Sequence, residues 1–369
     1  MRKKRGKQSG LSLIIMMALT LATCVDPIPF EAEDEVPKLV IFGTFTQLSQ
    51  DHEVSVRLTG KFGSLGRLVK GASVVLIDED GRRTQYHRKF GKHVLPKGIM
   101  EGEPGKAYKL EVTLLYGEKY ESTWEVMPEP VQIENTYWDI VYKQTLSDSD
   151  VTLEQFFIDV FIDTPIWTQS GNKAFLRWEV EETFSLEDIP GCRPWPVDLA
   201  DFCYFEVEDE FGHINLFSSI DDSQKKLEKH LVHSRQPNPY VEFNNIHYFN
   251  VFQYSLKEST YAYWEKIDIV SNPKGNIFDN IPAGVPGNIS KIRGGLEVLG
   301  YFEVAAVSVK RVFTTYHTIR ESIFIPRTCD PRIPPYYQKL EYCCYCDLFP
   351  KRIKTQVYNK IPKPDYWGE

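Results

Sequence analysis

Short runs of alternating apolar residues, each followed by turn residues, are the feature that most constrains the fold of this 369-residue chain. Four of them lie at residues 39–45, 54–58, 72–77 and 108–114. Alternation with a period of two places every second side chain on one face of a strand, as in half-buried sheets. The chain also contains 20 Tyr, 22 Phe and 7 Trp, residue types that favour strands over helical bundles. We therefore predict a mainly β protein.

The first part of the body, residues 37–130, has the strand spacing of a small β-sandwich. Asp78-Glu79-Asp80-Gly81 lies between two of its strands and predicts a tight hairpin, because Asp and Gly tolerate positive φ angles. A calcium loop is the alternative for these acids, but the full ligand spacing with its closing Glu is missing. Met127-Pro128-Glu129-Pro130 predicts the domain boundary, because proline cannot donate to a strand ladder.

Residues 131–369 predict a larger β-rich domain with one or two short helices. Ser255-Leu256-Lys257-Glu258 has the pattern of a capping box, so a helix should follow it, with Tyr261, Trp264 and Ile267 as its apolar stripe, and end near Pro273. Residues 223–233 are a weaker helical candidate. The strands expected in this domain are residues 137–142, 156–163 and 174–180, and one or two long strands within 296–309.

The N-terminal segment has the pattern of an export signal. Basic residues at positions 2–7 precede an apolar run, Leu11–Ala22, that is too short to span a bilayer comfortably. Cys24 follows directly, as in a bacterial lipobox, so residues 1–23 are predicted to be a lipoprotein signal peptide and Cys24 the acylated first residue of the mature chain. A cleaved secretory signal and a retained anchor are the alternatives. Residues 24–36, with two prolines and a run of acids, predict a tether that either is simply solvated or directs export to the cell surface.

Charge excludes one class of partner. The whole chain carries a net charge of −8, and removal of residues 1–23 would take away five basic residues and no acidic one, which leaves −13. Nucleic-acid binding depends on Lys and Arg that neutralise phosphates, and no basic stripe with interleaved aromatic residues is present in the sequence. We therefore expect no nucleic-acid partner.

Six cysteines remain once Cys24 carries lipid, and an even number in an oxidising compartment suggests disulfides. Cys192 and Cys203 enclose a short loop, so a local bridge between them is one arrangement; the other four allow three pairings. A zinc site is the competing interpretation, but the spacing of Cys343-Cys344-Tyr345-Cys346 lacks the spacer of paired zinc ligands. The candidate disulfide residues are Cys192, Cys203, Cys329, Cys343, Cys344 and Cys346.

The sequence offers no specific catalytic motif: both the Gly-x-Ser-x-Gly elbow and the phosphate-binding loop are absent from it. His230 and His233 could be two metal ligands on a helix, but a solvated face among lysines is the preferred interpretation. Glu181-Glu182 could serve glycoside hydrolysis only at a suitable separation in space. The period-two acids Asp159, Asp163, Glu179 and Glu181 are expected on solvent faces. We therefore predict no enzyme activity, metal or cofactor.

Trp195 is the one aromatic residue singled out for binding. It lies between two prolines in the segment between Cys192 and Cys203, where exposure would let it contact a ligand or partner. Packing within that loop is the alternative.

The order of motifs along the chain resembles the family called domain of unknown function 4249. No single motif is diagnostic, but their order is specific and covers nearly all of the mature chain. The motifs are Val69–Val74, Gly102–Leu110, Met127-Pro128, Arg177–Thr183, Ala262-Tyr263-Trp264, Gly287-Asn288-Ile289, Val298–Phe302, Cys344-Tyr345-Cys346 and Lys363–Trp367.

This resemblance implies an outer-membrane lipoprotein of Bacteroidota whose gene tends to accompany a TonB-dependent receptor. It also implies an immunoglobulin- or transthyretin-like β-sandwich followed by a larger β-rich domain, and it brings no catalytic residue. The expected function is that of a binding or accessory subunit, lipid-anchored and facing the cell surface, that helps a TonB-dependent β-barrel capture or gate its cargo. A structural or adhesive envelope protein, or a surface hydrolase of glycans or peptides, are the alternatives.

Overall fold

The computed structural model describes ten ranges and two single residues of the chain: 36–60, 66–146, 151–187, 202–208, 214–220, 224–237, 240–272, 284–320, 346, 349, 351–353 and 356–368. The described residues from Lys38 onward belong to one compact unit. The described part is mainly β, as the sequence predicts. The lipidation residue Cys24, Trp195 and four of the candidate cysteines, Cys192, Cys329, Cys343 and Cys344, lie outside the described residues.

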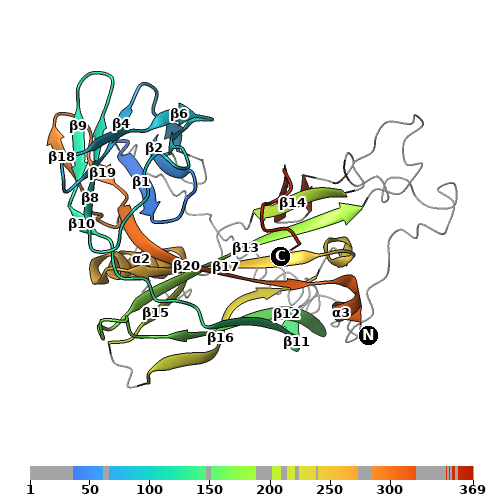
Figure 1. The fold of residues 1–369 in the computed structure, drawn as a ribbon. Helices are drawn as coiled ribbons and strands as arrows, with labels where there is room; N and C mark the ends of the chain where they lie inside the picture. Colours follow the sequence, from blue (N-terminus) through green and yellow to red (C-terminus); the bar gives the residue numbers. More distant parts are fainter. Residues whose placement is uncertain are drawn as a thin grey trace, which may run out of the picture. The chain divides into compact units, whose positions relative to one another are not determined.

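Thirteen of the described strands form one sheet, whose main path runs β21-β22-β14-β13-β17-β20-β1-β2-β7-β6 (Figure 1). Strands β15, β19 and β3 pair with β13, β1 and β2 beside this path. The bounds are β1 Leu39–Thr46, β2 His52–Leu58, β3 Arg67–Leu68, β6 His87–Lys89, β7 Lys92–Leu95, β13 Phe175–Glu187, β14 Phe202–Glu208, β15 Asn215–Ser218, β17 His247–Leu256, β19 Val298–Leu299, β20 Phe302–Thr314, β21 Arg352–Ile353 and β22 Gln356–Ile361.

A six-stranded sheet packs on one end of the large sheet and completes the predicted sandwich. Its strands are β4 Ser73–Asp78, β5 Arg83–Gln85, β8 Ala107–Thr113, β9 Lys119–Ser122, β10 Glu125–Val126 and β18 Ile289–Arg293. Burial alternates along β1 and β8, so that Ile41 and Phe45 meet Tyr108 and Leu110 in a shared core. The predicted hairpin at Asp78–Gly81 joins β4 to β5, and Gly81 has the positive φ that the turn requires.

Strand β20 connects the sandwich to the rest of the molecule. Its first residues pair in parallel with β1, and the remainder pairs antiparallel with β17 (Figure 1). β18 pairs with β9, and β19 pairs with β1. The sandwich therefore draws strands from both of the segments that the sequence separates near residue 130.

Close backbone contacts explain the glycines in two motifs of this region. A Cβ atom on Gly287 would lie 1.5 Å from the carbonyl oxygen of Gly300, and one on Gly300 would lie 2.0 Å from that of Ile41. Between these contacts, the side chain of Asn288 pairs with the backbone of Phe302, donating to its carbonyl at 2.9 Å and accepting from its N–H at 2.8 Å. Glycine is needed at positions 287 and 300 because the neighbouring backbone lies too close for a Cβ atom.

A three-stranded sheet packs against the large sheet and forms the second core. Its strands are β11 Asn135–Leu146, β12 Thr152–Pro165 and β16 Lys226–Arg235, with β12 in the middle. Ile158, Val160 and Ile162 of β12 are fully buried and pack with residues of β13 and β17, among them Leu176 and Val251. The predicted strands at 137–142, 156–163 and 174–180 are confirmed within β11, β12 and β13.

One of the two predicted helices forms. Helix α2, Glu258–Ser271, follows β17 and ends before Pro273, as expected. The short elements η1 Tyr240–Phe243 and α3 Tyr316–Arg320 are the other described helical segments. The capping box is wrong: Ser255 belongs to β17, where its hydroxyl accepts from the N–H of Val131 at 2.9 Å, and no side chain caps α2 at Lys257.

The second helical candidate, residues 223–233, is also wrong. Most of it is strand β16, which pairs antiparallel with β12. Two register shifts interrupt this pairing, and Lys229 within the strand has a φ of 51°. Such irregularity removes the clean alternation by which a strand is recognised in sequence.

Candidate functional site

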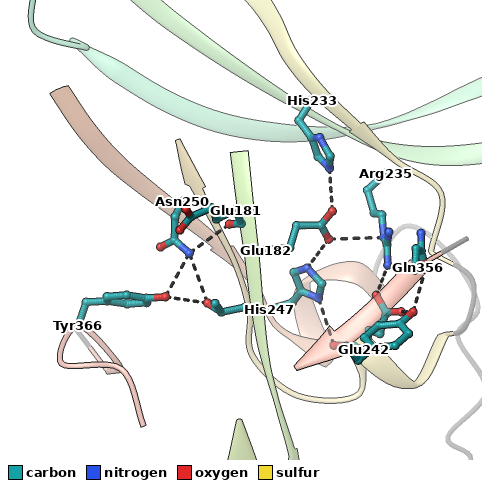
Figure 2. Close-up of polar contacts among 11 residues, drawn as sticks. Glu181, Glu182, His233, Arg235, Glu242, His247, Asn250, Gln356 and Tyr366 are labelled. Carbon is teal, nitrogen blue, oxygen red and sulfur yellow. Dashed lines mark hydrogen bonds and ion pairs between the residues drawn. The ribbon is translucent and has the colours of Figure 1, made fainter. Parts of the chain in front are cut away.

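A group of buried and half-buried titratable side chains surrounds Glu182 of β13 (Figure 2). This buried carboxylate accepts hydrogen bonds from Nε2 of His233 at 2.8 Å and from Nε2 of His247 at 2.7 Å, one at each oxygen. The Nε atom of Arg235 lies 3.4 Å from the second oxygen. Strands β16 and β17 therefore deliver three nitrogen groups to one carboxylate.

A second buried carboxylate extends this group. Glu242 of η1 accepts from the Arg235 guanidinium and from the hydroxyl of Tyr358, which belongs to β22. Arg235 also donates to the side-chain oxygen of Gln356 at 3.0 Å. We call Glu182, His233, Arg235, Glu242, His247, Gln356 and Tyr358 the buried charge cluster. It links the three-stranded sheet to the large sheet and to the C-terminal strand.

Arg235 controls the ionisation of the cluster. Burial alone would raise the pKa of Glu182, but the charge of Arg235 and the hydrogen bonds from the two histidines outweigh it and hold this pKa well below its ordinary value. For Glu242, burial dominates and raises the pKa against the opposing charge of Arg235. Both ring nitrogens of His247 face acceptors, because Nδ1 lies 3.3 Å from the backbone carbonyl of Glu242.

The ligand atoms of Glu182, Glu242 and His247 all lie within 4.8 Å of one another, a spacing that could hold a metal ion. The donor set does not fit one well. The carboxylate oxygens already accept from His233, His247 and Tyr358, and the Arg235 guanidinium contacts both carboxylates. A divalent cation would have to approach against this fixed positive charge, so the geometry favours Arg235 as the cation of the cluster.

The structure changes the interpretation of several acidic and basic residues. His233 is bonded within the buried cluster and His230 lies with its ring centroid 4.5 Å from that of Trp178, so the solvated histidine face predicted from the sequence is wrong. Asp159, expected on a solvent face, is buried and accepts from Lys143 and Ser234 at 2.7 Å each. In both cases the cause is the position of β16, which pairs with β12 in the three-stranded sheet and also contacts β13, so that these side chains meet protein groups.

Cys203 forms a disulfide with Cys346, 143 residues away. The local bridge between Cys192 and Cys203 is therefore wrong, because Cys203 is already paired. The disulfide lies in a small third core together with Phe184, Phe205 and Tyr358. It joins β14 to the segment that precedes the C-terminal strands β21 and β22.

Glu181 lies beside the cluster but titrates differently. Desolvation, and then the negative charges of Glu206 and Glu179, raise the pKa of Glu181 to about 7. The folded state therefore holds the proton of Glu181 more tightly than the unfolded chain does, and it loses stability as pH rises from about 4.5 through about 7.

We expect Glu181→Gln to stabilise the protein at pH 8 by about 1 kcal/mol, a value reduced from the pKa shift because solvent screens this exposed side chain. At pH 4, where the carboxyl is protonated in both states, the substitution should have little effect. Urea unfolding at the two pH values measures the difference, with Glu154→Gln, an exposed acid, as the control. An equal effect of Glu181→Gln at both pH values would contradict the assignment.

Motifs distant in sequence meet in internal contacts. Arg177 donates to Glu303 at 2.9 Å and stacks on Trp264, its guanidinium carbon 4.6 Å from the ring centroid. Tyr366, near the C-terminus, bonds through its hydroxyl to Thr183 at 2.8 Å and to Asn250 at 3.1 Å (Figure 2). Where described, these motif residues are therefore used to hold the fold together.

Sequence reasoning missed most of the buried charge cluster. In the sequence Glu182 stands out only as half of an acidic pair, and no motif marks Arg235, Glu242, His247 or Tyr358. Their spacing along the chain gives no local signal, because pairing of β13 with β17 and contact of β13 with β16 bring them together. A titratable residue at the start of an aromatic-rich strand, such as His247 in His247–Leu256, is a hint that the sequence contains.

Comparison with known proteins supports the resemblance seen in the motifs. No curated protein matches the chain. The model of the family described as Domain of unknown function (DUF4249) matches residues 25–311, which include the sandwich, the three-stranded sheet, helix α2 and most of β20. This match covers well over half of the sequence, and the chain therefore belongs to the DUF4249 family.

Proposed function

We propose that this protein is a lipid-anchored outer-membrane protein that works by surface contact, as a binding or accessory subunit of a TonB-dependent β-barrel transporter. The observation that carries the proposal is the N-terminal pattern: a basic start, a short apolar run and Cys24, followed by an acidic tether. Within the described residues, no helix is long and apolar enough to cross a bilayer. Several acyl chains on one cysteine would provide firm anchoring.

The structure of the buried charge cluster favours a function in binding over a function in catalysis. Its two carboxylates are at most 1% exposed, and their oxygens already accept from protein donors. A general acid or base must reach the proton that it moves, directly or through one water. A substrate would have to displace β16 or β22 to reach Glu182 or Glu242, so the cluster is better suited to holding sheets together.

The proposed lipid anchor predicts that the protein leaves the membrane when Cys24 is replaced. Cys24→Ser should abolish incorporation of labelled palmitate and release the protein from the outer-membrane fraction, because no acyl chain would then hold the mature chain to the bilayer. Fractionation with metabolic labelling measures this, and Cys192→Ser, which leaves the lipobox unchanged, is the control. Unlabelled wild-type protein in the membrane fraction would contradict the anchor.

The partner is tested by co-purification. Tagged, acylated protein isolated from detergent-solubilised outer membranes should bring down a large β-barrel of the TonB-dependent class. Recovery of the protein alone would contradict the accessory role and favour a structural or adhesive protein. Turnover of glycan or peptide substrates by the soluble form would instead favour a hydrolase.

A further inference from the structure

Exposed apolar side chains gather at the turns of one end of the sandwich. Phe90, in the turn between β6 and β7, is 96% exposed. Leu115 and Tyr116, in the turn between β8 and β9, are 67% and 89% exposed, and Ile292 of β18 is also exposed. Single exposed apolar residues are ordinary on protein surfaces, but several at one end indicate a contact surface.

Close contacts show that these turns lie at the same end. A Cβ atom on Gly91, next to Phe90, would lie 2.7 Å from Cδ1 of Leu68, and one on Gly71 would lie 3.3 Å from Cδ1 of Leu115. Only two residues lie between Leu68 and Gly71, so the two turns lie on either side of this short segment. Arg293, next to Ile292, donates to the carbonyl of Gly117 at 2.6 and 2.9 Å.

The folded unit also begins at this end. The carbonyl of Lys38 accepts from the N–H of Thr59 at 2.9 Å, and its ammonium group lies 3.6 Å from Glu297. Leu296 in turn accepts from the hydroxyl of Tyr120, at the start of β9. We call the surface formed by Lys38, Leu68–Gly71, Phe90–Gly91, Leu115–Gly117 and Ile292–Glu297 the tether end.

The length of the tether and the charge of the tether end both favour the bilayer as the surface that the tether end contacts. Thirteen residues lie between Cys24 and Lys38, so the two Cα atoms can be at most about 50 Å apart when the segment is fully extended. Arg67, Lys70 and Arg293 are exposed at this end, whereas the mature chain as a whole is acidic. Of the acids near these turns, Glu297 pairs with Lys38, Asp51 with Lys89 and Glu53 with Lys92, whereas Glu118 follows Gly117 in the turn. Aromatic and aliphatic tips beside Arg and Lys are typical of surfaces that enter the headgroup region of anionic membranes.

We propose that the tether end docks on the membrane that holds the acylated Cys24, with Phe90, Leu115 and Tyr116 entering the headgroup region. The inference rests on the proposed lipid anchor, which would place the protein at a membrane. The apolar side chains project from separate turns instead of lining a groove, an arrangement that fits a flat, deformable lipid surface better than an inserted peptide. Docking would fix the orientation of the body, which a flexible tether alone would leave free.

Vesicle flotation of the mature chain carrying Cys24→Ser tests the surface separately from the anchor. This unacylated protein should bind vesicles of phosphatidylethanolamine and phosphatidylglycerol, and binding should weaken as salt is raised. Phe90→Asn combined with Tyr116→Ser should lower the partition coefficient by about tenfold or more, because two buried rings are lost from the interface. Asn is chosen because Phe90 has a positive φ of 49°, which Asn tolerates.

Leu146→Ser and Ile269→Ser, 73% and 67% exposed elsewhere on the protein, are the matched controls and should bind as the parent does. Circular dichroism checks that each variant folds. We expect all of them to fold, because the substituted side chains are exposed. The inference would be overturned if the unacylated parent did not bind vesicles, or if the controls lost binding to the same extent as the double variant. If the double variant keeps vesicle binding but loses a co-purifying β-barrel, the tether end is a protein-docking surface and the membrane proposal is wrong. Palmitate labelling reports on the anchor independently.

Discussion

Replacing Arg235 by Met should destabilise the protein by about 3–5 kcal/mol, because it leaves two buried carboxylates without their shared cation. Arg235 contacts both Glu182 and Glu242, and its charge is the main force that keeps the pKa of Glu182 low despite burial. Met fills a similar volume, so the loss would report on charge more than on packing. Urea or thermal unfolding at pH 8 measures the difference.

The pH dependence makes this prediction specific. In the parent, the low pKa of Glu182 gives stability that is present above the ordinary pKa of about 4.5 and is lost only as pH falls through the lower folded value. In Arg235→Met, burial would raise the pKa values of both carboxyls, so they would be protonated more readily in the folded state. The deficit relative to the parent should therefore shrink between pH 8 and pH 5.

Arg83→Met is the matched control, because Arg83 forms an ion pair with Glu111 but is half exposed. Exposed pairs contribute at most about 1 kcal/mol, so this variant should unfold nearly as the parent does. A cost below 1 kcal/mol for Arg235→Met, or a deficit that does not change with pH, would show that the buried charge cluster does not hold the sheets together.

Removing the disulfide between Cys203 and Cys346 should destabilise the protein about as much as Arg235→Met does. The bridge closes a loop of 143 residues, for which chain entropy predicts a loss of about 5 kcal/mol when both cysteines become Ala. Both residues are buried in the third core, beside Phe184 and Tyr358, so lost packing would add to the cost. The C-terminal strand β22 should become more labile, because it pairs with β14 on one side and β21 on the other.

Peptide mapping without reduction should recover the fragments that contain Cys203 and Cys346 as one linked species. Hydrogen exchange then locates the loss: in the double variant, amides of β22 and β14 should exchange faster, while those of β8 in the sandwich keep their protection. Cys203 recovered with a different partner, or uniform loss of protection across the sandwich, would contradict this role.

Local patterns predicted local structure well. The alternation of Leu39–Phe45 and Tyr108–Leu114 gave strands with one buried face, and Asp78–Gly81 gave a hairpin, because each depends on neighbouring residues alone. The predictions were wrong where contact with a residue distant in sequence determined the local structure. Residues 226–235 form a strand because β12 pairs with them, and Ser255 bonds to the backbone of Val131 instead of capping α2.

The candidate site could not be predicted for the same reason. Alternation along β13 predicts that Glu181 and Glu182 point to opposite faces, but not which face another sheet covers. Pairing with β17 over ten residues and contact with β16 place Glu182 against two histidines and Arg235, and leave Glu181 near other acids. Long-range register thus gave adjacent carboxyls pKa shifts of opposite direction.

The sequence by itself determined the mainly β class, the hairpin, helix α2 and the family, because periodicity, turn chemistry and motif order are properties of the linear chain. Tertiary structure alone decided the partner of Cys203, the sharing of β20 between the sandwich and the rest of the sheet, and the assembly of the buried charge cluster. Each of these joins residues many positions apart. Strand register fixes such contacts, and register follows from the packing of whole sheets.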